Sequence, residues 1–484
     1  MAQLHDLTAL EQGAALRRGE IGRVELVEHY LARIAEQGDA LGAFVTVTAD
    51  AAQAAAGEPT TIVRVGTRAG ALEGVPVAIK DLTLTAGVRT TFGSAAFADF
   101  VPAVDADVVA LMHAAGLISV GKTTTSEFGL SLYSETDVAP PARNPWAPRF
   151  TAGGSSGGAA AAVAAGLVPF AQGNDGGGSL RIPASICGLV GYKPSRGLVS
   201  GGPLGSGGFG LPTNGPIART VTDAAALLDV LAVPVPGEPF PSPPRPAAGF
   251  LDAARHPDTY LPKDRPLRIG RYRTPMLADV EPADEVVAVW EQASAYLAAL
   301  GCDIVDVDPP FRPDAEPYFE ALWRVLSLAP VPPEKESMLL PITRWMRARG
   351  REVGPDQLLL ALAELQVRVR RHARAAASYD LLLSPVLTRA QAPIGWFTSA
   401  GDPAEDFARQ ERFSPYCAAY NLTGQPAVSL PLGQAADGTP IGVMLAAAAG
   451  ADALLIAASA LVEAAVPWVH RHPPMWNGSG APIA

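Results

Sequence analysis

The sequence predicts an α/β fold in which helices cover both faces of a β-sheet. Three observations support this prediction. Short apolar runs typical of strands alternate along the chain with longer segments of helical apolar spacing. The run GVPVAIKDL (74–82) is apolar on both faces, as strands inside a covered sheet are. Hydrophobic residues make up 48% of the 484 residues and charged residues 18%, which suits a globular protein with a sizeable core.

The first predicted elements are two helices. The N-terminal twenty residues read as a helix in which Thr8 and Glu11 are spaced as a capping box. Residues 20–36 place apolar side chains from Val24 to Ile34 at helical intervals. Both segments lie before the first predicted strand.

A strand–helix–strand unit follows. GVPVAIKDL is the first strand, and residues 106–116 are expected to form a helix that Gly116 ends. LISVG (117–121) is the next strand. Later segments repeat this alternation, with predicted helices at 283–300 and 356–378 and predicted strands at 302–308, 379–385, 427–433 and 441–446. Asp437 and Gly438 predict a turn that joins the last two strands as a hairpin.

Charge and cysteine content restrict the compartment and the partners. The net charge of −11 disfavours nucleic-acid binding, which usually needs a basic surface. Cys187, Cys302 and Cys417 lie far apart, with no C-x-x-C pair and no zinc spacing, as expected in a reducing compartment. The N-terminus lacks the apolar core of a signal peptide, and the Ala/Gly-rich run 157–173 is too short for a membrane span. We therefore expect a cytoplasmic protein without a membrane or nucleic-acid partner.

Two motifs suggest other chemistries. GLISVGKT (116–123) fits the P-loop pattern, but its interior is strand-forming and a helix precedes it, whereas a P-loop is a Gly-rich turn after a strand. GGSSGG (153–158) contains G-x-S-x-G, but it lacks the preceding apolar strand that a nucleophile elbow requires. A Ser–His–acid hydrolase stays an alternative, because the sequence has downstream histidines, namely His256, His372, His470 and His472.

The stretch GNDGGGSLRIPAS (173–185) contains a candidate nucleophile. Gly176, Gly177 and Gly178 precede Ser179. Glycines adopt dihedrals closed to other residues and let a carbonyl substrate approach the backbone. Their N–H groups can then stabilise the oxyanion that forms when Ser179 attacks. The alternative is a plain Gly-rich turn.

A serine nucleophile without a histidine needs another base, and a desolvated lysine can serve. Lys80 ends the apolar run 75–79, so its stem should be buried, and burial lowers the pKa of an ammonium group from about 10.4. The carboxyl ends of strands are also where open α/β sheets form their sites. The alternative is an ordinary lysine that pairs with Asp81 or reaches solvent.

Asp175 and Arg181 flank the glycines. A buried arginine needs a partner, so a bidentate pair between these two residues would brace the turn. The alternative is two separate surface charges.

Taken together, these segments resemble the amidase signature family. GGSSGGAAAAVAAG (153–166) and GNDGGGSLRIPASICGLVGYKPSRG (173–197) match its signature stretch, including the 24-residue separation of Ser155 and Ser179. GVPVAIKDL around Lys80 matches as well, and weaker similarity covers most of the chain. The resemblance implies a large mixed β-sheet core sandwiched between helices, in a single domain over residues 1–484. It also makes the Pro-rich segment 233–375 a variable elaboration near the substrate entrance.

The resemblance further implies an amidase that cleaves a C–N bond with a Ser–cis-Ser–Lys triad. Ser179 matches the nucleophile, Ser155 the bridging serine after a cis Gly154–Ser155 peptide, and Lys80 the base. Gly176 to Gly178 and the Ser179 amide match the oxyanion hole, and Ser156 matches a supporting position. No metal or organic cofactor is implied.

The substrate implied by the resemblance is a small carboxamide, cyclic amide or hydrazide. GNDGGGSLRIPAS, 384–395 and 464–473 are most similar to the subgroup of 6-aminohexanoate cyclic dimer hydrolase and acylhydrazide-cleaving enzymes. Asn174 stands where threonine is common and Gly176 where threonine or isoleucine often occurs. The alternatives are an acylhydrazide- or aryl-acylamide-specific hydrolase and an amidotransferase A-type subunit that needs partner chains. The latter is disfavoured by the segment 125–131. The oligomeric state stays open, with a homodimer as one alternative.

Overall fold

The computed structural model describes residues 3–58, 70–204, 207–275, 277–309, 311 and 313–477. Its strands form one eleven-stranded sheet in the order β1-β3-β2-β4-β6-β5-β10-β11-β9-β7-β8. The strands are β1 Phe44–Val47, β2 Pro76–Lys80, β3 Ile118–Thr123, β4 Phe170–Asp175, β5 Val190–Lys193, β6 Thr213–Ala218, β7 Arg268–Arg271, β8 Asp303–Asp306, β9 Leu381–Pro385, β10 Ala427–Gln434 and β11 Pro440–Ala447.

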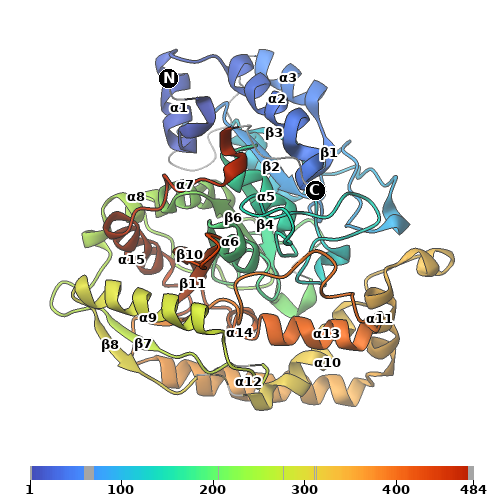
Figure 1. Cartoon of the computed structure of the whole chain (residues 1–484), viewed down its shortest axis with the longest axis vertical. Helices are drawn as coiled ribbons and strands as arrows, with labels where there is room; N and C mark the ends of the chain where they lie inside the picture. The colour runs from blue at the N-terminus through green and yellow to red at the C-terminus, as the bar shows by residue number, and fades with distance from the viewer. Residues whose placement is uncertain are drawn as a thin grey trace.

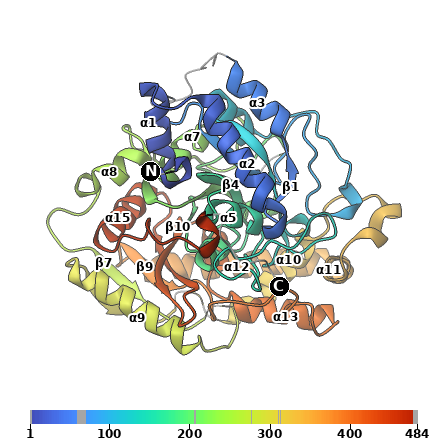
Figure 2. The same ribbon diagram turned by 45° about the horizontal axis from the view of Figure 1, so that its top comes forward.

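The helices lie around this sheet (Figure 1). They are α1 Ala9–Arg18, α2 Arg23–Leu41, α3 Ala49–Gly57, α4 Asp107–Ala114, α5 Gly157–Ala164, α6 Arg181–Cys187, α7 Val221–Leu231, α8 Phe250–Arg255, α9 Asp284–Ala299, α10 Glu316–Leu326, α11 Pro341–Glu352, α12 Pro355–Ala376, α13 Pro403–Phe413, α14 Ala418–Thr423 and α15 Asp452–Ala465. Figures 1 and 2 both show α5 and β4 near the centre of the molecule, and α10, α11 and α13 grouped at one end.

The sheet is mixed. β2 runs parallel to both β3 and β4, and β7 runs parallel to both β8 and β9. The central pairs β4–β6, β6–β5, β5–β10 and β10–β11 are antiparallel. The predicted hairpin is therefore confirmed, with Ala427 opposite Ala446 and Gln434 opposite Pro440. The predicted mixed α/β fold is confirmed as well.

Two apolar layers cover the two faces of the sheet. Side chains alternate between them along each strand, so that Ala78 belongs to one layer and its neighbours Val77 and Ile79 to the other. The first layer contains α2, α5, α6, α10 and α14, and the second contains α4, α7, α8, α9 and α15. Such double coverage explains why the strand sequences are apolar on both faces.

The other predicted helices and strands are found close to their expected positions, except that the helix predicted for the N-terminal twenty residues begins at Ala9, after a 3₁₀ turn at Leu4–Asp6. Residues 1–2 of that prediction lie outside the described residues. The capping box is present, since Thr8 Oγ1 accepts from the Glu11 N–H and the Glu11 carboxylate accepts from the Thr8 N–H. LISVGKT forms the buried strand β3 and no phosphate-binding turn. In the described part of the chain, no helix combines the length and apolar character that crossing a bilayer requires.

Residues 233–246, at the start of the Pro-rich segment 233–375, form no helix or strand. The whole range 233–375 supplies β7 and β8 to the sheet. It also contains α10, which carries Trp323 to the glycines before Ser179.

Candidate active site

Lys80 lies at the carboxyl end of β2, between the parallel neighbours β3 and β4. All five residues of β2 are buried, and the Lys80 side chain is 0% exposed. Its Nζ donates to Ser155 Oγ at 2.7 Å and to the side-chain oxygen of Asn174 at 2.6 Å. Burial lowers the pKa of Lys80 well below its usual value, and the negative charge of Asp175 opposes this effect only in part.

Ser155 connects Lys80 to Ser179. Its Oγ donates to Ser179 Oγ at 2.8 Å, so the three side chains form one continuous hydrogen-bonded line. Ser155 is 1% exposed and Ser179 is 4% exposed, so both serines of the hydrogen-bonded line are buried. The Gly154–Ser155 peptide is cis, as the family resemblance implies.

The chain around Ser155 is held by Ser134, a residue that the sequence analysis did not single out. Ser134 Oγ lies 3.1 Å from the Gly153 carbonyl oxygen and 3.2 Å from the Ser155 carbonyl oxygen, and it accepts from the Gly157 N–H. A side chain at Gly154 would meet the backbone of residues 132–133 at 2.7 Å. This close approach of two backbones requires glycine at position 154.

The three glycines before Ser179 differ in whether their position requires glycine. Gly178 has a φ of +136°, and a Cβ there would lie 2.6 Å from Ile182 and 2.8 Å from Cys417. Gly176 and Gly177 lie outside the left-handed region, and a Cβ on either would make only ordinary contacts of 3.5 Å or more. The expectation that all three adopt dihedrals closed to other residues is therefore wrong for Gly176 and Gly177.

The amides of the turn are also not equivalent. The Gly178 N–H donates to Asp175 Oδ1 at 2.7 Å, so it is already satisfied within the protein. The N–H groups of Gly176, Gly177 and Ser179 have no acceptor among the described residues. These three amides, rather than that of Gly178, are the available donors for a substrate oxygen.

Asp175 and Arg181 form the predicted bidentate pair. Arg181 Nε and Nη2 donate to the two Asp175 carboxylate oxygens, each at 2.9 Å, and both side chains are fully buried. The alternative of two separate surface charges is excluded. Burial alone would raise the pKa of Asp175, but the charge and hydrogen bonds of Arg181 outweigh it and hold this pKa below its usual value.

Asn421 of α14 completes this brace and was missed by the sequence analysis. Its Nδ2 donates to the main-chain and side-chain oxygens of Asp175 at 2.8 and 2.9 Å, and its Oδ1 accepts from Arg181 at 2.7 Å. The segment NLTGQPAVSLPLG (421–433) resembles the family, and this was the available signal. The sequence around Asn421 does not indicate that this residue contacts Asp175, which lies 246 positions away.

Asn174 was noted in the sequence only as a departure from threonine. In the structure it is the last residue but one of β4, before Asp175, and both its side-chain oxygen and its main-chain oxygen accept from Lys80 Nζ, at 2.6 and 3.4 Å. Ser156 Oγ donates to the same Asn174 carbonyl oxygen at 3.2 Å. Ser156 thus supports the residue that holds Lys80.

The alternative partners of Lys80 and Ser179 are engaged elsewhere. Asp81 lies 3.5 Å from Lys122, whose Nζ also donates to the Thr83 carbonyl oxygen, so Asp81 does not pair with Lys80. His372 is buried on α12 and hydrogen-bonds Gln425. In the described ranges, no histidine hydrogen-bonds either serine of the line, which leaves the Ser–His–acid alternative without support.

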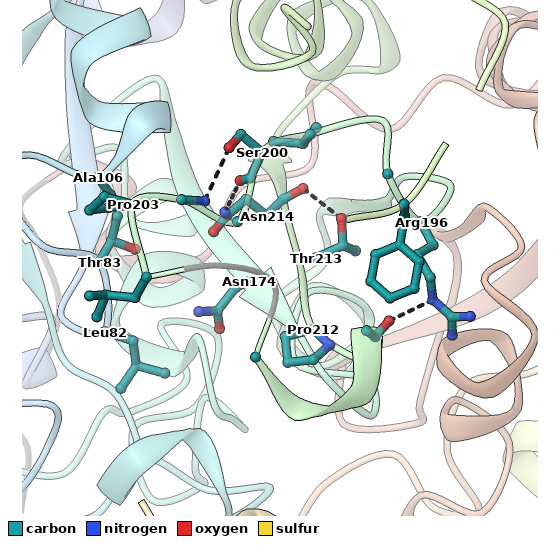
Figure 3. A pocket seen from close by; sticks show the side chains of 18 of the residues that line it. Leu82, Thr83, Ala106, Asn174, Arg196, Ser200, Pro203, Pro212, Thr213 and Asn214 are labelled. Atoms are coloured by element: carbon teal, nitrogen blue, oxygen red, sulfur yellow. Dashed lines mark hydrogen bonds between the residues drawn. The ribbon is translucent and has the colours of Figure 1, made fainter. Parts of the chain in front are cut away.

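A cavity of about 220 Å³ lies beside Asn174 (Figure 3). Asn174 forms part of its wall, between Leu82 on one side and Pro212 on the other. Thr213 and Asn214 of β6 and the segment 196–204 close it further. We call this space the Asn174 cavity.

The sequence matches known amidases over nearly its whole length. The family model described as Amidase matches residues 25–456. The 6-aminohexanoate-cyclic-dimer hydrolase of Paenarthrobacter ureafaciens is 34% identical over 97% of this chain and 97% of that protein. A solved structure of 6-aminohexanoate cyclic dimer hydrolase is similar with a TM-score of 0.86 and 30% identity, covering 98% of this chain and 100% of the other. A bacterial aryl acylamidase of the amidase signature enzymes follows with a TM-score of 0.82 and 25% identity, covering 99% and 100%.

Proposed function

The chain belongs to the amidase signature family and hydrolyses amide C–N bonds, and from this premise we propose that Ser179 is the nucleophile of an acyl-enzyme mechanism. Ser155 is the proton relay and Lys80 the general base. The observation that carries the proposal is the buried line from Lys80 Nζ through Ser155 Oγ to Ser179 Oγ, with hydrogen bonds of 2.7 and 2.8 Å.

The contacts of Lys80 suit a neutral amine. A neutral amine has two N–H donors and one lone pair, and Asn174 offers one acceptor oxygen on its side chain and one on its main chain. When these take the two N–H groups, the lone pair is directed at Ser155, and both hydrogen bonds of the line run in the reverse direction: Ser155 Oγ donates to Lys80 Nζ and accepts from Ser179 Oγ. Burial stabilises this uncharged form, because it lowers the pKa of Lys80.

The steps follow from this arrangement. The Ser179 proton passes to Ser155 while the Ser155 proton passes to Lys80, and Ser179 Oγ bonds to the amide carbon. The proton then returns through Ser155 to the leaving nitrogen as the C–N bond breaks. Water attacks the resulting ester by the same relay and releases the acid. Each proton taken up by Lys80 is returned, so the enzyme ends each cycle unchanged.

The oxyanion of each tetrahedral intermediate is bound by backbone amides. Gly176, Gly177 and Ser179 supply the available N–H groups, and loss of one such donor typically costs about 3–4 kcal/mol of transition-state stabilisation. The Asp175–Arg181 pair fixes this turn, since Asp175 accepts from the N–H groups of both Gly178 and Leu180.

The substrate we propose is a small carboxamide, cyclic amide or hydrazide. The similarity to a cyclic-dimer hydrolase and to an aryl acylamidase supports small amides. We further propose that the enzyme acts in the cytoplasm, supported by its three unpaired cysteines. Size-exclusion chromatography with light scattering would distinguish a monomer from a homodimer.

Assay of the purified chain tests this function. Primary amides, anilides, hydrazides and lactam oligomers would be compared by kcat/KM, with no other protein added. We expect turnover of at least one of these substrates by the chain alone. A chain that is inert until a partner protein is added would instead support the amidotransferase subunit class.

A further inference from the structure

Helix α12, Pro355–Ala376, lies at the bottom of the molecule in the view of Figure 1. Its 22 residues give it a length of about 33 Å. One face of the helix is buried through Ala361, Leu365 and His372, and Leu365 belongs to the first apolar layer. The opposite face of α12 is exposed, although it carries large apolar side chains.

The centre of this exposed face is apolar. Leu359 is 66% exposed, Leu360 56% and Val367 53%, and among the described large hydrophobic residues only Leu204 is more exposed. Ala363 is exposed as well. Residues three, four or seven positions apart share one face of a helix, so these four α12 residues form one continuous apolar patch. A grouped apolar patch marks an interaction site, whereas scattered single residues do not.

Charged residues of opposite sign lie at the two ends of the apolar patch. Asp356 lies toward the N-terminal end of α12 and Arg370 toward its C-terminal end, and both are exposed. In the described part of the chain, α12 forms ion pairs only through Arg368, which pairs with Glu364 and Asp314. Asp356 and Arg370 are therefore available to a partner.

The sequence of the exposed face is symmetric about Ala363. Leu359 and Val367 lie four positions to either side of Ala363, and Asp356 and Arg370 lie seven positions to either side. Two antiparallel copies of the helix that cross at Ala363 place each Leu359 beside the partner's Val367, and each Asp356 beside the partner's Arg370. A two-fold interface requires this self-complementarity, in which residue i meets residue j and j meets i.

We propose that α12 forms the interface of a homodimer, in which two copies of the helix pack antiparallel about a two-fold axis at Ala363. The contacts between Leu359 and Val367 form its apolar core, and the pairs of Asp356 with Arg370 form its two polar ends. This arrangement also places the positive N-terminal end of each helix dipole beside the negative C-terminal end of the other.

The charges of this face favour a second copy of the chain over a membrane surface. A helix that lies on an anionic membrane typically combines lysine and arginine with apolar and aromatic side chains. Here an aspartate lies at one end of the apolar patch, the patch has no aromatic residue, and the whole chain has a net charge of −11. Against a second copy, by contrast, Asp356 contributes a pair with Arg370.

Charge reversal tests the interface. Asp356→Arg places an arginine beside the partner's Arg370, and Arg370→Asp places two aspartates together. Each repulsion occurs twice in the dimer, so each variant should raise the dissociation constant of the dimer about tenfold or more. The double variant pairs opposite charges again and should recover dimerisation. An equimolar mixture of the two single variants should form the heterodimer for the same reason.

Sedimentation velocity measures this equilibrium, since the chain has a mass of 50.1 kDa and the dimer twice that mass. Protein concentrations of about 1–100 µM cover the affinity expected of a small interface. Ala363→Glu places two carboxylates at the two-fold axis and should also give monomers. Glu28→Arg, a reversal of charge at an exposed position on α2, is the matched control and should leave the dimer unchanged. Every variant should keep the wild-type circular dichroism spectrum, which excludes misfolding as the cause of dissociation.

Three outcomes would overturn the proposal. The first is a wild-type chain that stays monomeric over this concentration range. The second is a dimer whose mass none of Asp356→Arg, Arg370→Asp and Ala363→Glu changes, because that dimer would use another face. The third is a monomeric wild type that sediments with vesicles of phosphatidylcholine and phosphatidylserine and loses this binding in Arg370→Asp, which would assign the face to a membrane.

The dimer proposal does not depend on the proposed catalytic roles. Lys80, Ser155 and Ser179 all belong to one chain, so the hydrogen-bonded line is complete without a partner. The interface is tested by mass and by vesicle binding, and the amidase mechanism by turnover. A failure of one is therefore distinguishable from a failure of the other.

Discussion

Lys80 and Asn174 show how single residues set the chemistry of the site. Lys80 is 0% exposed, and its nearest side-chain acceptors, Ser155 and Asn174, carry no charge. The carboxylate of Asp175 is close by, but it is bound by both Arg181 and Asn421. The amine is therefore surrounded by oxygen acceptors without a dedicated counter-ion, which favours its uncharged form.

Asn174→Asp tests this arrangement. A carboxylate at 2.6 Å from Nζ would stabilise the ammonium form and raise the pKa of Lys80. Because the proposed mechanism uses uncharged Lys80 as the base, the rise of kcat/KM with pH should move to higher pH, and the rate at pH 7 should fall about tenfold or more. Asn174→Thr keeps an oxygen acceptor and should keep the position of the wild-type profile. An Asn174→Asp profile that coincides with the wild type would contradict the role of Lys80 as base.

The glycine turn gives a matched pair of variants. Gly178→Ala places a Cβ at 2.6 Å from Ile182 in a φ region that disfavours side chains. It should lower the free energy of unfolding by roughly 1–3 kcal/mol. Gly177→Ala makes only contacts of 3.5 Å or more and should leave stability close to that of the wild type. Urea unfolding followed by circular dichroism measures both, and equal destabilisation by the two variants would refute the distinction.

For helices and strands, the local sequence pattern was sufficient to predict where each element lies and which type it is. It did not predict which distant segments contact one another. β2, α4 and β3 follow from apolar spacing and from the glycine after the helix, and they were predicted within a few residues. The contact of Ser134 with the 153–157 segment was not predicted, because neither segment has a periodic signal. The same holds for Asn421 and Trp323, which reach the glycine turn from distant parts of the chain.

The candidate site itself was predicted unequally. Lys80, Ser155 and Ser179 came from the family resemblance, and the structure brings them together in one hydrogen-bonded line. The Asp175–Arg181 pair followed from spacing and the need of a buried charge for a partner. The hydrogen bond from Gly178 to Asp175 was missed, since the sequence does not show which way an amide points.

The packing of α15 against α7 contains a group that titrates near neutral pH. Both carboxylate oxygens of Glu463 on α15 accept from the Val221 N–H that begins α7, at 3.3 and 3.0 Å. Burial raises the pKa of Glu463 from 4.5 to about 8. Because the folded state prefers the protonated form of Glu463, the contribution of Glu463 to folding stability is complete below pH 4.5. It is lost as the pH rises through 8.

Glu463→Gln removes this titration and keeps an acceptor for Val221. The stability advantage of the variant over the wild type should therefore grow as the pH rises from 5 to 9, as measured by urea unfolding at fixed ionic strength. Glu352→Gln, at an exposed position on α11, is the control and should show no such growth. A difference between Glu463→Gln and wild type that stays constant over this range would contradict the raised pKa.

In the whole molecule, two apolar layers cover the two faces of one sheet, and the site lies where strands of this sheet end. β2 and β4 run parallel, so Lys80 and Asp175 reach the same edge. α5 and α6 pack beside them in the first layer, with Ser155 just before the first helix and Ser179 just before the second. The residues of the hydrogen-bonded line thus come from three segments that only the complete fold brings together.

In the proposed mechanism, Ser179 carries the acyl group and Lys80 enables its attack. The most direct test is the intact mass of the chain, quenched with acid during turnover of butyranilide, followed by peptide mapping. We predict one added butyryl group, on the peptide that contains Ser179. It should be absent in Ser179→Ala and in Lys80→Met, and present in His372→Asn, which changes a buried residue outside the hydrogen-bonded line. A butyryl group on another residue, or one that forms normally in Lys80→Met and is lost in His372→Asn, would refute this mechanism.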